Sequence, residues 1–230
     1  MKELDEKAKR HAALVQASYK PLHLREAEIN AFYPNEYEII KNRDNHLVVR
    51  NRATNQVTLA MPGTDITNER NRRKRDLLTD GLVTFGVHQL GNRFQSADRE
   101  VQSLIREYGK DNITIAGHSL SGQISSDLSL KHGVESYSFN RGGSHLTNRS
   151  NIFNYLNPRM RRNKKKNNVF FSRPSLKKGF DPLSILTTSD PLAKTTFVKQ
   201  GELLPSEKSV LNPHSIGHFT PKNRQQIAME

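Results

Sequence analysis

The fold is decided by Ile113-Thr114-Ile115-Ala116-Gly117-His118-Ser119-Leu120-Ser121-Gly122. A short apolar run rich in β-branched residues ends at a glycine, a serine follows two residues later, and residues 123–131 can form a helix. This order predicts a strand, a sharp turn and a helix, which is the pattern of a nucleophile elbow. In such an elbow the serine hydroxyl stands clear of the backbone and the helix N-terminus points at it. Gly117 is required because a side chain at this position would collide with the turn.

The stretch departs from the G-x-S-x-G pattern at one position. Ser121 stands where the pattern has its second glycine, and the glycine is displaced to Gly122. Serine is small enough for the turn. A buried strand that leaves through a Gly-Ser turn into a helix also occurs without any catalysis, so these residues alone favour a catalytic serine only slightly.

The composition limits the size of the fold and the class of partner. The 230 residues suffice for one sizeable α/β domain and are few for two. Lysine and arginine number 36 against 23 aspartates and glutamates, a net charge of +13, so the surface must be strongly basic. Such a charge attracts phospholipid headgroups, nucleic acid or an acidic protein without selecting among them.

Several kinds of chemistry lack support in the sequence. The chain has no cysteine, which excludes disulfides, thiolate metal sites and a cysteine nucleophile. Helical His-x-x-x-His pairs, clustered carboxylates and phosphate-loop motifs are missing, so no metal or other cofactor is predicted. The aromatic residues do not alternate with the basic clusters as a nucleic-acid stacking platform requires.

The sequence shows neither the apolar segment of a signal peptide in residues 1–10 nor an apolar run long enough to cross a bilayer. We therefore expect peripheral contact with an anionic membrane. We also expect an intracellular or virion-associated protein rather than a classically secreted one.

The first part of the chain predicts one helix and three strands. An amphipathic helix is expected within residues 1–20, because apolar side chains recur there every three or four residues, and Pro21 ends it. A polar connector follows. Strands are then predicted at 37–40, 46–50 and 56–61, in a hairpin or meander, because Asn/Arg/Asp turns separate them.

The rest of the chain predicts the remainder of an α/β fold. A helix over residues 94–108 precedes the strand at 113–116, and further strands are predicted at 135–140, 169–171 and 183–187. This alternation favours a parallel sheet. We expect a mostly parallel central sheet flanked by helices, with residues 1–230 forming a single domain.

Two segments are too basic and polar to form a core. Residues 65–76 are predicted as an exposed loop, and their basic side chains are Arg70, Arg72, Arg73, Lys74 and Arg75. Residues 144–168 are predicted as a basic surface excursion. For residues 70–75 a binding role and a merely solvated loop have equal support, whereas for residues 159–166 the solvated surface is favoured.

A serine hydroxyl needs a histidine base, and the histidine needs a carboxylate that orients it and stabilises its charge. On α/β-hydrolase scaffolds these follow in the order serine, acid, histidine. Ser119, Asp190 and His214 meet this order, and Asp190 follows a candidate strand directly. Asp181 offers the acid almost as well, and His218 competes with His214 for the base.

The other histidines have no local partner pattern. His118 is expected to pack or form a hydrogen bond beside Ser119, because a neighbour along the turn points elsewhere. The remaining ones are expected on the surface or as satisfied core residues: His11, His23, His46, His88, His132 and His145.

Residues 56–219 resemble the class 3 lipase family. The family's elbow usually reads Gly-His-Ser-Leu-Gly-Gly, which residues 117–122 match except at Ser121. Its Phe-Arg-Gly-Thr element is similar to Met61-Pro62-Gly63-Thr64, of which Gly-Thr is kept. Its Trp-x-x-Asp, Asp-Pro-Val-like and His-Ser-Ile-x-x-Phe elements look like residues 77–80, 190–192 and 214–219.

The resemblance implies an α/β-hydrolase-like fold and a serine ester hydrolase of lipase type. Ser119 would be the nucleophile, His214 the general base and Asp190 its orienting acid. The backbone N–H groups of Thr64 and Leu120 would form the oxyanion hole. Residues 65–76 occupy the place of the family's lid.

Lipase lids usually expose apolar residues, whereas residues 65–76 would expose arginines. This departure points away from neutral triglyceride and toward phospholipid or another anionic ester, because guanidinium groups pair with phosphate oxygens. A rival hypothesis is a catalytically inactive, hydrolase-like basic module that binds nucleic acid, an anionic surface or a virion-like assembly. The net charge, Ser121 and Pro62 motivate it.

Overall fold

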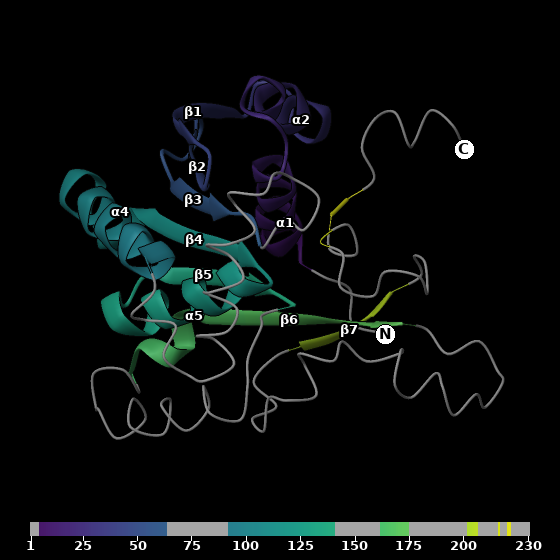
Figure 1. Ribbon diagram of the computed structural model, residues 1–230. Coiled ribbons are helices and arrows are strands. Elements are labelled where there is room, and N and C mark those ends of the chain that lie inside the picture. Colours follow the sequence, from purple (N-terminus) through teal and green to yellow (C-terminus); the bar gives the residue numbers. More distant parts are fainter. Residues whose placement is uncertain are drawn as a thin grey trace, which may run out of the picture.

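Figure 1 shows the computed structural model of the chain, which describes residues 5–63, 92–140, 162–174 and 202–206 together with residues 216, 220 and 221. All described strands belong to one seven-stranded sheet, in the order β1-β2-β3-β4-β5-β6-β7. Helices pack on both faces of this sheet. The chain is therefore of the α/β class, as its sequence predicts.

The elements alternate along the chain between helices and strands. The helices are α1 (Glu6–Ser18), α2 (Arg25–Phe32), α4 (Asn92–Tyr108) and α5 (Leu120–His132). The strands are β1 (Tyr37–Arg43), β2 (His46–Asn51), β3 (Val57–Met61), β4 (Ile113–His118), β5 (Glu135–Phe139), β6 (Asn167–Pro174) and β7 (Glu202–Ser206). Short 3₁₀ turns lie between some of them: η1 (Leu22–Leu24), η3 (Lys110–Asn112) and η4 (Lys164–Lys166).

The sheet is mixed and mostly parallel. Strands β1, β2 and β3 form an antiparallel meander, which confirms that prediction, and β3 through β7 run parallel to one another. Strands β3, β4 and β5 therefore end side by side at Met61, His118 and Phe139, which we call the carboxyl edge. Strand β2 begins at this edge, because Leu47 pairs with Ala60.

Side chains alternate across the sheet and form two hydrophobic cores. On β3, Ala60 faces α1, whereas Leu59 faces α4 and α5. On β4, Ala116 and Ile115 divide in the same way. The small side chains of Ala60 and Ala116 meet the alanines of α1, so this helix can lie close to the sheet.

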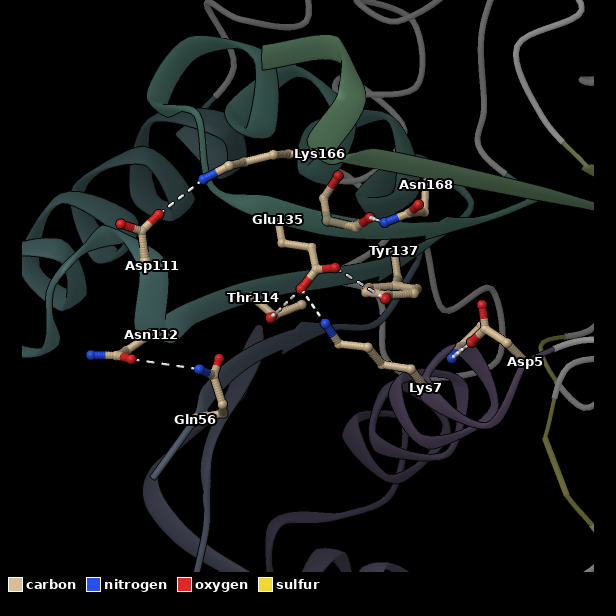
Figure 2. A network of polar contacts seen from close by, with 12 residues as sticks. Asp5, Lys7, Gln56, Asp111, Asn112, Thr114, Glu135, Tyr137, Lys166 and Asn168 are labelled. Atoms are coloured by element: carbon tan, nitrogen blue, oxygen red, sulfur yellow. Dashed lines mark hydrogen bonds and ion pairs between the residues drawn. The ribbon is translucent and has the colours of Figure 1, made fainter. Parts of the chain in front are cut away.

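Helix α1 is anchored at its start to the amino ends of the parallel strands. Asp5 caps the helix, because its side chain accepts a hydrogen bond of 2.7 Å from Ala8 N. Lys7 Nζ lies 2.6 Å from Glu135 Oε2, and Tyr137 Oη donates to Glu135 Oε1 at 3.2 Å (Figure 2). The helix runs from this end of the sheet to the carboxyl edge.

The predicted basic excursion over residues 144–168 is wrong at its C-terminal end. Strand β6 begins at Asn167, and Asn168 Nδ2 donates to Ser136 O of β5 at 3.1 Å (Figure 2). Lys166 Nζ pairs with Asp111 Oδ1 at 3.0 Å. The strand was underestimated because asparagine side chains, rather than apolar ones, make its first contacts; residues 144–161 lie outside the described residues.

The polar connector expected after Pro21 is also wrong, because α2 occupies most of it. Only Arg25 and Ile29 are buried in this helix, so it carries little apolar periodicity. The Arg25 guanidinium donates to Ser18 O at 2.8 Å and to Arg43 O at 2.6 Å. It thereby ties the end of α1 to the β1–β2 turn at the carboxyl edge. Strand β7 was not predicted, and the strand predicted at 183–187 lies outside the described residues.

Candidate active site

Ser119 lies at the sharp turn between β4 and α5, as predicted. Its backbone has φ 56° and ψ −124°, a combination that residues with a side chain rarely adopt. Ser119 N donates to Phe139 O at 3.0 Å, which holds the turn against the end of β5. Strain of this kind costs on the order of 1–3 kcal/mol and persists only where the surroundings enforce it. The residue is partly exposed.

The predicted requirement for Gly117 is confirmed. A Cβ atom on this residue would lie 2.2 Å from the carbonyl oxygen of Ser121 and 2.5 Å from its carbonyl carbon. These atoms belong to the first turn of α5, so they cannot move without displacing the helix. Gly117 therefore lets α5 start directly above the end of β4.

The Ser119 hydroxyl is not used to cap the helix. Ser119 occupies the N-cap position of α5, yet its side chain forms no capping hydrogen bond. Its carbonyl accepts the first helical bond, from Gln123 N at 3.2 Å. Leu120 begins the helix, and amides of a first turn lack carbonyl partners within the helix. The turn thus combines a serine hydroxyl with the positive end of a helix.

The contacts of the Ser121 side chain explain why serine, rather than glycine, stands at this position. The side chain is fully buried, and its Oγ donates to Pro62 O at 2.6 Å. Pro62 lies in the loop after β3, the segment that corresponds to the predicted oxyanion element. The hydroxyl therefore joins the elbow to this loop, an interaction that glycine cannot make.

Gly63 brings the loop after β3 into contact with the elbow. A Cβ atom built on Gly63 would lie 2.8 Å from Ser119 Cβ and 2.9 Å from His118 O. Only glycine fits so close to both. Arg93 of α4 holds the same loop, because its guanidinium donates to Pro62 O and, at 3.3 Å, to Gly63 O.

Tyr19, the residue that follows α1, reaches the loop from the other face of the sheet. Its hydroxyl accepts a hydrogen bond of 2.6 Å from Gly63 N and lies 2.7 Å from His118 Nδ1. His118 is buried, and its bond to Tyr19 confirms the prediction that it is a hydrogen-bonding neighbour of Ser119. From the sequence, Tyr19 fits only an apolar position of the first helix, although a partly buried phenol usually has a polar partner.

The other predicted site residues lie outside the described residues. These are the oxyanion residue Thr64, the basic residues Arg70, Arg72, Arg73, Lys74 and Arg75, the acid Asp190 with its alternative Asp181, and the base His214 with its alternative His218. Ile216, midway between the two histidines, is described. It is buried in the hydrophobic cluster that contains Phe139 and the apolar face of α1. One residue of the histidine motif is thus packed into the core on the α1 side.

Two buried histidines, His11 and His46, differ from their prediction, because a ring nitrogen of each has no hydrogen-bond partner among the described residues. His11 is buried against Tyr137, and among the described residues its Nδ1 has no hydrogen-bond partner, so it is not a satisfied core histidine. Burial, together with the charges of Lys7 and Arg10, lowers the pKa of His11 to about 3. His132 Nε2 lies 2.6 Å from Asp98 Oδ1, a partner on α4 that no local pattern indicates.

The described part of the chain contains no group of three or more histidine, cysteine or acidic side chains that could hold a metal ion. Within the same residues, no helix combines the length and the apolar character needed to span a membrane. No model of a known protein family matches the chain, and no curated protein sequence is significantly similar to it. Function must therefore be inferred from the geometry around Ser119.

Proposed function

We propose that the protein is a serine ester hydrolase of lipase type, with an α/β-hydrolase-like fold, that cleaves acyl esters of membrane phospholipids. The observation that carries this proposal is the strained backbone of Ser119, at φ 56° and ψ −124°, between a strand end and a helix start. Strained residues cluster at active sites, where the strain presents a side chain in a fixed position. The Ser119 hydroxyl also forms no helix-capping hydrogen bond.

The proposed reaction proceeds through an acyl-enzyme. Ser119 Oγ attacks the ester carbonyl carbon while His214 takes the hydroxyl proton, and Asp190 orients the histidine. The N–H groups of Leu120 and Thr64 bind the oxygen that becomes negatively charged. The tetrahedral intermediate then expels the alcohol, which takes the proton from His214. Water, activated by the same histidine, releases the fatty acid and restores Ser119.

A lipid surface is the substrate source that the surface chemistry favours. The exposed large hydrophobic side chains of the described residues are Leu22 and Leu24, with 41% and 44% of their surfaces accessible. Both belong to η1, which follows Tyr19 and lies on the side of the carboxyl edge. The net charge of +13 adds attraction to anionic headgroups, about 1 kcal/mol for each basic residue near the surface.

The proposal is tested by labelling with a fluorophosphonate, which reacts with activated serines. Wild type, Ser119→Ala and His214→Ala are compared with and without anionic liposomes, and release of fatty acid from phosphatidylglycerol is followed in parallel. Ser103→Ala, at a partly exposed position of α4, is the matched control. We expect labelling and hydrolysis that require both Ser119 and His214 and that liposomes stimulate.

Wild-type protein that neither labels nor hydrolyses lipid under either condition would refute the proposal. Labelling that survives Ser119→Ala would also refute it. The same assay on Asp190→Asn, Asp181→Asn and His218→Ala decides between the alternative acids and bases, because only the true partner lowers labelling strongly.

The high positive charge supports a second candidate, a catalytically inactive module that binds nucleic acid or another anionic surface. Binding of this kind weakens steeply as salt concentration rises. Affinity for duplex DNA and for anionic vesicles, measured between 50 and 200 mM salt, would then be strong and equal in wild type and Ser119→Ala.

A further inference from the structure

We propose that Tyr19 is a positioning residue that holds the loop after β3, at Pro62 and Gly63, against the nucleophile elbow. This inference rests on the proposed function. The Tyr19 hydroxyl stands between two backbone segments that flank Ser119: it is 2.6 Å from Gly63 N in the loop after β3 and 2.7 Å from Nδ1 of His118, the residue before the nucleophile. No local sequence pattern assigns it this role.

The two hydrogen bonds join the segments on either side of Ser119. A phenol oxygen has one proton to donate and can also accept. The oxygen accepts from Gly63 N–H and shares a second hydrogen bond with His118 Nδ1, in which either atom can be the donor. The phenol thus links a main-chain amide of one segment to a side chain of the other.

The bond to Gly63 also decides which amide of the loop can serve in catalysis. Gly63 N–H is directed to Tyr19 and is therefore not available for the oxyanion. The next amide, that of Thr64, is then the donor from this loop in the proposed mechanism. Tyr19 acts on the reaction through this loop and does not contact the substrate, so it is not a catalytic residue.

Tyr19 completes a set of anchors that hold the loop from both faces of the sheet. From the side of α4 and α5, Ser121 and Arg93 donate hydrogen bonds to carbonyl groups of Pro62 and Gly63. From the side of α1, Tyr19 accepts from the amide of Gly63. Removal of the phenol hydroxyl deletes both contacts, and among the described residues the loop then keeps its anchors from the side of α4 and α5.

The test compares Tyr19→Phe with Tyr33→Phe. Tyr33 is a matched control, because its hydroxyl is buried and has no hydrogen-bond partner among the described residues. For a short-chain ester we expect Tyr19→Phe to lower kcat about 10²-fold with KM within about twofold, since a small misplacement of catalytic groups has this effect. The rate of fluorophosphonate labelling should fall by a similar factor, because phosphonylation uses the same oxyanion hole. Tyr33→Phe should match wild type in both.

A kcat of Tyr19→Phe within twofold of wild type would overturn the inference, and so would an effect confined to KM or shared equally with Tyr33→Phe. The state of His118 is a readout that needs no turnover. In ¹⁵N NMR spectra, with the signal assigned by His118→Gln, we expect the Nδ1 shift of His118 to change in Tyr19→Phe. If the wild type is inactive but gives this NMR result, only the proposed function is refuted. If the Nδ1 shift of His118 is unchanged in Tyr19→Phe, the proposed role of Tyr19 in holding the loop is refuted.

Discussion

Ser119→Gly should stabilise the protein while it abolishes the nucleophile. Ser119 has φ 56° and ψ −124°, and its Cβ lies so close to Gly63 that a second Cβ there would be 2.8 Å away. Glycine adopts such backbone angles without steric cost. Substitution therefore releases strain that serine has to bear.

The magnitude follows from two opposing contributions. Release of the strain contributes about 1–3 kcal/mol to the free energy of unfolding. Glycine loses more backbone freedom on folding, which costs about 0.5–1 kcal/mol. No capping bond is lost, because the Ser119 side chain does not cap α5. The expected net gain is about 1 kcal/mol, which for a chain of this size raises Tm by about 2–4 °C.

Urea unfolding of wild type, Ser119→Ala and Ser119→Gly measures this gain. Alanine keeps a Cβ and hence the strain, so Ser119→Ala should unfold close to wild type, and both variants should fail to label with a fluorophosphonate. Asn35→Gly is the control: Asn35 has φ 58°, but asparagine tolerates this angle and the gain should stay within a few tenths of a kcal/mol. If Ser119→Gly proves no more stable than Ser119→Ala, the turn is not strained and the main support for a nucleophile is lost.

Two further predictions concern stability. Gly117→Ala should lower the free energy of unfolding by about 3 kcal/mol, because its Cβ would meet backbone atoms of Ser121 at 2.2 and 2.5 Å; a thermal melt of Gly117→Ala that superimposes on that of wild type would contradict the steric argument. His11 has its pKa lowered from 6.5 to about 3 in the folded protein, so the unfolded chain binds its proton first and stability should fall as the pH drops from about 6.5 toward 3. His11→Phe keeps a ring against Tyr137 and should flatten this part of the pH profile, whereas the exposed His23→Gln should not; superimposable profiles for His11→Phe and wild type would refute the assignment.

The sequence predicted the elements whose signal is local. The β-branched run, Gly117 and Ser119 lie within a few residues of one another, and the strand, turn and helix they predict are confirmed. Helix α2 was missed because its position depends on Arg25, a charged side chain buried among backbone carbonyls of Ser18 and Arg43, outside the helix. A buried guanidinium leaves no apolar periodicity from which a helix could be predicted.

The polar contacts of the site were beyond sequence reasoning for a similar reason. Tyr19 fits the apolar face of an amphipathic helix, and nothing near it in the sequence indicates that its hydroxyl meets Gly63 and His118. Ser121 could be judged only as small, whereas its hydroxyl bonds to Pro62. Asp190 and His214 remain predictions, because chain order alone also admits Asp181 and His218.

The position of helix α1 at the start of the chain determines when its contacts can form during synthesis. Its partners are synthesised long after it: His118 follows Tyr19 by 99 positions, and Glu135 follows Lys7 by 128. At about 5–20 residues per second, a ribosome needs about 5–20 s to add those 99 residues. Until the end of that interval the alanine-rich face of α1 can pack on β2 and β3 but not on β4 and β5. The helix made first therefore completes its docking late, and the anchor of the loop beside Ser119 can form only after β4 has emerged.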